Sequence, residues 1–107
     1  MISRRHLLAG AASALALPAE AQAASLRDLA AARGLVFGSA AATYELKDAD
    51  FVAALTRDAA QLGPEYEMKR DVLQPEPGRY DFADMDRLFA FARNRGLSVR
   101  GHTLVWY

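Results

Sequence analysis

Two short segments carry the side chains whose types and spacing could do chemistry. Glu65 and Lys69 combine a carboxylate that accepts hydrogen bonds with an ammonium that donates them, so the pair can bind neighbouring hydroxyl groups. His102 and Trp106 combine an imidazole with an indole, whose face can stack on the apolar face of a sugar ring and whose N–H donates one hydrogen bond. Residue types alone also allow a solvated ion-paired loop, a structural histidine and a core tryptophan.

The composition excludes several other chemistries. The 107 residues include 13 basic and 13 acidic side chains and no cysteine, which excludes a disulfide scaffold, a thiolate metal site and a cysteine nucleophile. A net charge of zero argues against nucleic acid as a partner, because there is no basic excess to neutralise phosphates. The sequence also has no glycine-rich phosphate loop, HExxH helix, serine elbow or metal-ligand cluster.

The first 23 residues have the features of an export signal. Ser3–Leu8 resembles the twin-arginine motif, an Ala/Leu stretch follows, and Ala21–Ala23 has the A-x-A form of a signal-peptidase site. We expect Ala24 to be the mature N-terminus of a protein exported to the periplasm or the extracellular space, with no membrane attachment after cleavage. The alternative is a short membrane anchor, but the apolar run is well short of the roughly 20 residues that a span needs.

Three helices are predicted in the remainder. The first begins at the N-cap Ser25 and ends at Gly34, and the second begins at Asp48 or Asp50. The third is capped by Asp81 and ends at Gly96, and we assign its phenylalanines to the core: Phe82, Phe89 and Phe91.

Strands are predicted between these helices. Residues 35–40 form an apolar run typical of a buried parallel strand, and residues 97–102 form another strand candidate. Residues 61–68 are ambiguous, because periodicity extends the second helix through Leu62 whereas a repeating strand–helix pattern requires a strand there. The proline-containing residues 71–80 are predicted to be an ordered loop.

This order is a βαβαβ unit, which implies a parallel sheet. Such a sheet needs cover on both faces, so the unit is expected to be part of a larger barrel or doubly wound sheet. Ligand sites in both architectures lie at the carboxyl ends of the strands. In this scheme, residues 65–69 and residues 102–106 each follow a predicted strand.

One stretch of the chain resembles a known family. The segment DVLQPEPGRYDFADMDRLFAFARNRGLSVRGHTLVWY, with PEYEMKRD just before it, is similar to the N-terminal third of family 10 glycoside hydrolases, the secreted endo-1,4-β-xylanases. The lead-in SLRDLAAARGLVFGSA resembles the approach to the first strand of that family. The resemblance covers nearly all of residues 25–107.

The resemblance implies the first three βα units of a TIM (β/α)8 barrel, formed by residues 24–107 and incomplete. It implies cleavage of β-1,4-xylan with retention of configuration and without a metal or an organic cofactor. Retaining hydrolysis uses two carboxyl groups about 5 to 5.5 Å apart. In the family both are glutamates on strands four and seven, so we expect the acid/base and the nucleophile to lie beyond Tyr107 and this chain alone to be inactive. Neither Glu65 nor Glu67 is assigned to those roles.

The family pattern implies binding roles for the residues that opened this section. Glu65 and Lys69 correspond to contacts with sugar hydroxyls, and His102 and Trp106 to contacts with the sugar nearest the cleaved bond of xylan or a xylo-oligosaccharide. The pattern also implies a short strand at about residues 61–66 despite Pro64.

Three positions depart from the family pattern. Tyr66 replaces the usual asparagine, Arg70 the usual tryptophan, and Tyr107 the usual histidine. The first departure puts hydrogen bonding to xylose at that position in doubt. Two alternatives to a xylanase fragment stay open: a non-catalytic xylan-binding pseudoenzyme or remnant, and an unrelated small α/β interaction domain.

Overall fold

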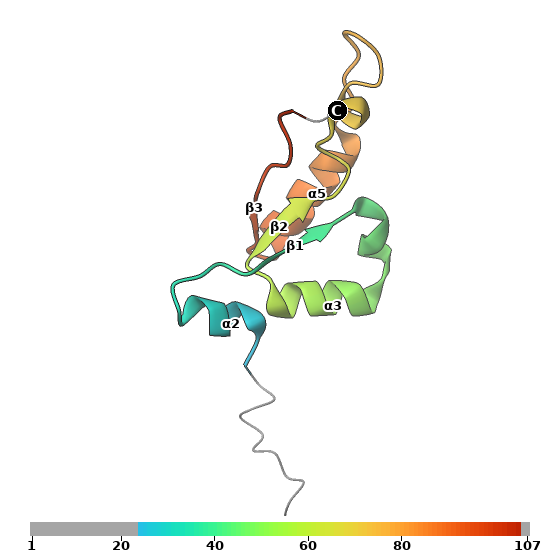
Figure 1. The fold of residues 1–107 in the computed structure, drawn as a ribbon. Helices are drawn as coiled ribbons and strands as arrows, with labels where there is room; N and C mark the ends of the chain where they lie inside the picture. The colour runs from blue at the N-terminus through green and yellow to red at the C-terminus, as the bar shows by residue number, and fades with distance from the viewer. Residues whose placement is uncertain (1–23, 106–107) are drawn as a thin grey trace, which may run out of the picture.

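The computed structural model describes residues 24–105. The predicted export signal, Trp106 and Tyr107 lie outside this range. The elements in chain order are α2 (Leu26–Ala31), β1 (Gly38–Ala41), the 3-10 helix η3 (Thr43–Lys47), α3 (Ala49–Asp58), β2 (Gln61–Pro64), α4 (Arg70–Leu73), α5 (Ala83–Asn94) and β3 (Ser98–Val99). In Figure 1, α5 runs behind the strands and α3 lies beneath them.

The three strands form one parallel sheet in the order β1-β2-β3. Gly38 is opposite Gln61 and Ala41 opposite Pro64, while Gln61 is also opposite Ser98 on the other side. The predicted βαβαβ order is therefore confirmed. Because the strands are parallel, their carboxyl ends meet at one edge of the sheet.

The ambiguous segment after α3 contains the central strand. α3 ends at Asp58, and the amide of Ala60 then donates to the Phe37 carbonyl at 2.8 Å while its carbonyl accepts from the Ser98 amide at 3.0 Å. The helical interpretation through Leu62 is wrong, since these backbone groups pair with neighbouring segments. Pro64 is tolerated because it is the last residue of β2.

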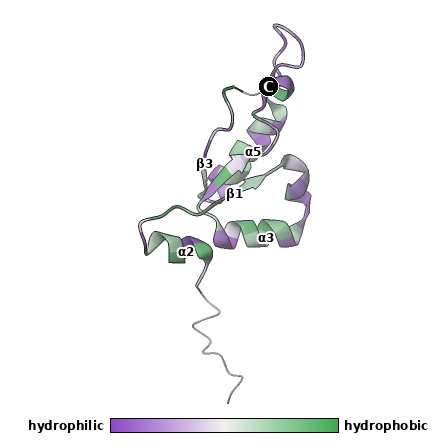
Figure 2. Cartoon of the chain, in the orientation of Figure 1, coloured by the Kyte–Doolittle hydropathy of each residue, from purple (hydrophilic) through white to green (hydrophobic). Residues whose placement is uncertain are grey.

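The core lies on one face of the sheet, between the strands and helices α3 and α5. Leu62 of β2 and Leu88 of α5 are fully buried, and the cluster around them comprises Ala41, Leu55, Ala59, Met85, Ala92 and Leu97. Removing these side chains from water is the main stabilising contribution to such a fold. In Figure 2 the hydrophobic colouring runs along α3, whereas the loop between α4 and α5 is mostly hydrophilic.

The first strand is not buried as predicted. β1 begins at Gly38 rather than residue 35, and Gly38, Ser39 and Ala40 are exposed while only Ala41 is buried. The reason is that, within residues 24–105, the packed helices cover one face of the sheet. The other face is open.

Two of the predicted core phenylalanines are also exposed. Phe82 is the N-cap of α5 rather than part of its buried face, and its ring stacks on Tyr80 with centroids 5.9 Å apart. Phe89 is 46% exposed because the buried stripe of α5 is formed by residues 85, 88 and 92, while Phe91 packs against the edge of the core. Asp81 still contributes at the start of this helix, where its carboxylate accepts from the Ala83 amide at 3.0 Å.

The segment predicted as one long loop is partly ordered into regular structure. It contains the short helix α4 and an isolated antiparallel bridge between Glu76 and Arg79. The prolines at 75 and 77 prevent a longer helix here.

Helix α2 docks on the carboxyl end of α3, as its capping signals allow. The Ser25 hydroxyl accepts from the Asp28 amide at 3.1 Å, which confirms the predicted N-cap. The Leu26 amide donates to Asp58 Oδ1 at 3.1 Å, and the Arg27 guanidinium donates to the Thr56 carbonyl at 2.7 Å. These bonds satisfy backbone amides at the N-terminus of α2 and a backbone carbonyl at the C-terminus of α3.

Candidate functional site

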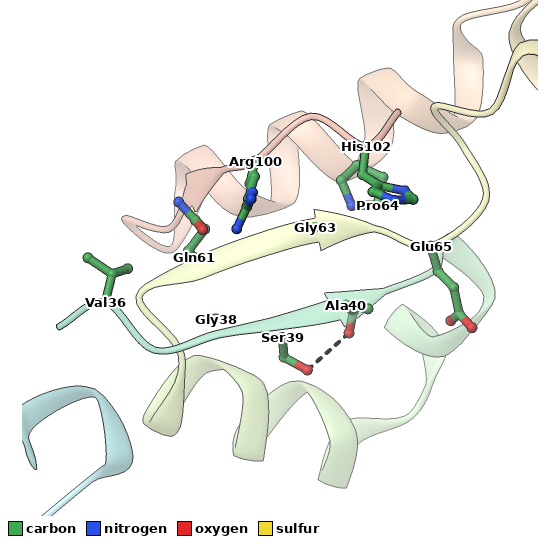
Figure 3. A pocket seen from close by; sticks show the side chains of 10 residues that line it. All are labelled: Val36, Gly38, Ser39, Ala40, Gln61, Gly63, Pro64, Glu65, Arg100 and His102. Carbon is green, nitrogen blue, oxygen red and sulfur yellow. Dashed lines mark hydrogen bonds between the residues drawn. The ribbon is translucent and has the colours of Figure 1, made fainter. Parts of the chain in front are cut away.

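An open groove of about 500 Å³ runs across the uncovered face of the sheet (Figure 3). We call it the sheet groove. It is lined by Val36, Gly38, Ser39, Ala40, Gln61, Gly63, Pro64, Glu65, Arg100 and His102. Small residues on β1 and β2 leave the middle of the groove hollow, while larger polar residues stand at its ends.

Glu65 is positioned by the end of the central strand. It follows β2 directly, and its amide donates to the Ala41 carbonyl at 3.0 Å, so the ladder continues to this residue. In Figure 3 its side chain extends beyond the carboxyl end of the strand. A carboxylate placed there can accept hydrogen bonds from a ligand lying over the strand ends.

His102 reaches the same end of the groove from the third strand. The Arg100 amide donates to the Leu62 carbonyl at 2.9 Å, which extends the pairing beyond β3 toward His102. Figure 3 shows His102 beside Pro64, with the Glu65 side chain pointing away from it. Parallel pairing therefore brings two of the four predicted site residues, 37 positions apart in the chain, to one groove.

Lys69 is not among the residues that line the groove. It is the N-cap of α4, and its Nζ stands 4.7 Å from the centroid of the Tyr66 ring. A cation over an aromatic face is held by the ring quadrupole. The fourth predicted residue, Trp106, lies outside the described residues.

Glu67 is a structural residue that sequence reasoning missed. It is only 4% exposed, and its Oε1 accepts from the Thr43 amide at 2.6 Å and from the Thr43 hydroxyl at 3.0 Å. Its Oε2 accepts from the Tyr66 amide at 3.1 Å. Burial raises the pKa of this carboxyl, but the hydrogen bonds from Thr43, Tyr66 and its own amide outweigh burial and hold the pKa below its ordinary value. Glu67 is thus an ionised clamp between two loops.

Tyr44 belongs to the same end of the sheet. It is 60% exposed and follows Thr43, which Glu67 holds. Partial burial, followed by the negative charges of Glu45, Glu65 and Glu67 and by the Tyr66 phenol, raises the pKa of Tyr44. The signal for this cluster is not visible in the sequence, because Tyr44 and Tyr66 lie 22 positions apart.

Residues 24–105 contain no group of three or more histidine, aspartate or glutamate side chains arranged to hold a metal ion. No helix in that range combines the length and apolar character needed to cross a bilayer.

Parallel strands packed against helices, with polar residues at their carboxyl ends, define part of an α/β protein, either a barrel or a doubly wound sheet. The chain belongs to glycosyl hydrolase family 10, which it matches over residues 25–107. The described strands are the first three of a (β/α)8 barrel of this family, as predicted.

Individual relatives agree with this assignment. The chain is 37% identical over 87 residues to endo-1,4-beta-xylanase A of Phanerodontia chrysosporium, covering 78% of this chain and 21% of the relative. It is 39% identical over 71 residues to beta-1,4-xylanase of Dictyoglomus thermophilum, covering 66% and 20%. The chain therefore spans about a fifth of the length of these curated relatives.

Solved structures show the same fold. Xylanase 10B from Thermotoga maritima is 35% identical with a TM-score of 0.67, over 78% of this chain and 26% of that one. An endo-beta-1,4-xylanase from Gloeophyllum trabeum is 32% identical with a TM-score of 0.72, over 79% and 27%. Xylanase 10B from Thermotoga petrophila, 34% identical with a TM-score of 0.67 over 78% and 26%, was solved in complex with xylobiose.

Proposed function

We propose that residues 24–107 form part of the xylan-binding cleft of an exported endo-1,4-β-xylanase. The observation that carries the proposal is the meeting of Glu65 and His102 at the carboxyl end of one open groove in a chain of this family. The xylobiose complex of the Thermotoga petrophila relative supports a xylo-oligosaccharide as ligand.

The proposed roles follow from the donor and acceptor capacity of each side chain. Glu65 accepts hydrogen bonds from sugar hydroxyls, and Lys69 donates to hydroxyl oxygens. His102 can do either, and Trp106 supplies an apolar face for a pyranose ring. All four residues bind rather than react.

The chemistry of retaining hydrolysis requires two carboxyl groups about 5 to 5.5 Å apart, one as acid/base and one as nucleophile. Glu67 does not suit either role, because its oxygens are occupied by backbone and hydroxyl donors in a buried position. We place the catalytic pair outside residues 1–107, so that this chain alone binds xylan fragments without cleaving them.

Titration of the isotope-labelled chain with xylotetraose, followed by NMR, tests the binding role. We expect shifts around the sheet groove and a dissociation constant that rises at least fivefold in Glu65→Ala, since each lost hydrogen bond to a charged group weakens binding by roughly that factor or more. Glu76→Ala is the matched control, because Glu76 is an exposed glutamate in the α4–α5 loop and its side chain forms a surface ion pair with Arg79.

Equal affinities of the Glu65→Ala and wild-type chains would remove Glu65 from the site, and absence of any shift would overturn the binding proposal. A reducing-sugar assay on xylan tests the catalytic part. Activity of the 107-residue chain that survives Glu65→Gln would show that the essential carboxyl groups lie within it.

The twin-arginine resemblance of residues 3–8 supports export of the folded protein. N-terminal sequencing of protein recovered outside the cytoplasm should read from Ala24. Intact Met1 on the recovered protein would contradict the proposed cleavage.

A further inference from the structure

Glu65 follows the last residue of β2, and the hydrogen bonds that place it run through the backbone. Its amide donates to the carbonyl of Ala41, the last residue of β1, at 3.0 Å. The next amide along the chain, that of Tyr66, donates to Glu67 Oε2 at 3.1 Å. These two nitrogens lie on either side of the Glu65 Cα, and the peptide group between Glu65 and Tyr66 is planar, so fixing both nitrogens restricts φ and ψ of Glu65. Those two angles set the direction in which its side chain leaves the backbone.

Glu67 supplies the second of these anchors from a buried position. It is 4% exposed, and its Oε1 accepts from the Thr43 amide at 2.6 Å and from the Thr43 hydroxyl at 3.0 Å. Thr43 is the first residue of η3 and lies two positions after Ala41. The segment that follows β1 is therefore bonded to the segment that follows β2 at two points, one before and one after the Glu65 Cα.

The direction of the Glu65 side chain decides whether its carboxylate meets a ligand. Glu65 lines the sheet groove, and Figure 3 shows its side chain extending beyond the carboxyl end of β2. Glu67 is not among the residues that line the groove, and both of its oxygens accept from donors of Thr43 and Tyr66. An effect of Glu67 on ligand binding must therefore pass through the residues that it holds.

We infer that Glu67 is a positioning residue for Glu65: by holding the Tyr66 amide and Thr43 together, it sets the direction in which the Glu65 carboxylate enters the sheet groove. This inference rests on the proposed xylan binding by Glu65. The role needs a carboxylate, because both of its oxygens accept hydrogen bonds and donors face both of them. In Glu67→Gln an NH2 group, which donates, would face one of these donors, and one of the two links would be lost.

Xylotetraose titrations of the 107-residue chain, arranged as a double-mutant cycle, test the inference. Glu67→Gln should weaken binding about threefold to fivefold, since a misdirected Glu65 loses hydrogen bonding to the ligand. In the Glu65→Ala background, Glu67→Gln should change the dissociation constant by less than about 1.5-fold, because a residue that acts only through Glu65 has no effect once that carboxylate is gone. A merely stabilising role of Glu67 would not depend on Glu65 in this way.

Glu45→Gln is the matched control for the loss of a glutamate that accepts a backbone amide. Glu45 belongs to η3, and its Oε2 accepts from the Ala42 amide at 2.8 Å, a bond that stays within the segment after β1. Thr43→Val is a second control, because it removes the hydroxyl donor to Glu67 and keeps the amide donor. Both variants should bind within about twofold of the wild type, since neither breaks the link between the two segments. Circular dichroism checks that every variant is folded.

Amide hydrogen exchange without ligand, followed by NMR, tests the positioning step separately from binding. In Glu67→Gln, the Thr43 amide or the Tyr66 amide should exchange about tenfold faster than in the wild type, because one of them loses its acceptor. Rates are compared with that of the Ala60 amide, which donates to the Phe37 carbonyl away from Glu67 and so reports any general loss of stability. Glu45→Gln should leave both exchange rates unchanged.

Two results would overturn the positioning role while leaving xylan binding by Glu65 intact. One is that Glu67→Gln changes affinity by the same factor with and without the Glu65 carboxylate, including no change in either background. The other is wild-type exchange of both amides in Glu67→Gln. A wild-type chain that does not bind xylotetraose would overturn the proposed function and this inference together.

Discussion

The clamp formed by Glu67 shows how one side chain can organise a site without contacting a ligand. Its carboxylate accepts hydrogen bonds from residues 43 and 66, so it ties the start of η3 to the loop after β2. Buried carboxylates are unfavourable unless hydrogen bonds compensate for lost hydration. Here three donors from Thr43 and Tyr66 provide that compensation, and the result is a pKa below the ordinary value of the group.

Because Glu67 is ionised in the clamp, we predict that its titration makes the stability of the folded chain depend on pH. Its pKa is lower in the folded than in the unfolded chain, so between these two values the unfolded state binds more protons and stability rises with pH. The contribution is complete above the ordinary pKa of 4.5 and is lost as the pH falls below it. At pH 7, the free energy of unfolding of Glu67→Gln, measured by denaturant unfolding, should be about 1 to 3 kcal/mol lower than that of the wild type.

The difference between the two proteins should shrink as the pH is lowered toward the folded-state pKa, because Glu67 itself is then neutral. Asp58, whose pKa is also lowered by its bonds to Arg57 and to the Leu26 amide, titrates in both proteins and cancels in the comparison. A constant difference from pH 7 to pH 3 would show that the charge of Glu67 is not what stabilises the clamp.

At the scale of elements, the pairing of β1 with β2 depends on close backbone approach at Gly38. A Cβ at this position would lie 3.0 Å from the Gln61 carbonyl oxygen and 3.2 Å from the Gln61 Cβ, both within β2. The same pairing continues to Ala41 and Pro64 and so sets where Glu65 leaves the strand. Register at the start of the strand therefore controls the groove at its end.

Substituting the two strand glycines should change stability by different amounts. Gly38→Ala forces backbone atoms apart and should lower the free energy of unfolding by about 1 to 3 kcal/mol. Gly63→Ala is the matched control, because its nearest contact, the Arg100 carbonyl oxygen, would be 3.9 Å away, and stability should change by less than about 1 kcal/mol. Equal denaturation midpoints for both variants would mean that β1 is not held at this distance from β2.

At the scale of the whole molecule, the packing is one-sided. Leu62 and Leu88 meet at the centre of the core between the sheet and α5, while the groove face carries Gly38, Gly63 and exposed polar residues. One core therefore supports every element that reaches the site. Its loss should unfold the groove together with the helices.

Two neighbouring residues of α5 allow the contribution of the core to stability to be measured. Leu88→Ala should lower the free energy of unfolding by about 2 to 5 kcal/mol, because it leaves a cavity in a fully buried site. Phe89→Ala removes a larger side chain from the same helix but one that is 46% exposed, so its cost should be less than half as large. Chemical denaturation of both variants gives the comparison, and a larger cost for Phe89→Ala would place the core on the other face of α5.

Local signals in the sequence determined the order of elements and several of their ends. Ser25 caps α2, and Gly34 and Gly96 end helical segments with φ of +70° and +66°, because a cap or a left-handed turn needs only nearby residues. The family resemblance added the strand at residues 61–64 and implied binding roles for Glu65 and His102, which the parallel sheet brings to one groove.

Tertiary structure decided what depends on distant partners. The strand at Gln61 forms because backbone groups around Ala60 pair with residues 37 and 98, against the helical periodicity that extends to Leu62. Phe82 and Phe89 are exposed because burial depends on which face another element covers, and periodicity alone does not specify that. The Glu67 clamp joins residues 24 positions apart, so only the folded chain reveals that this glutamate ties the segment after β1 to the loop after β2.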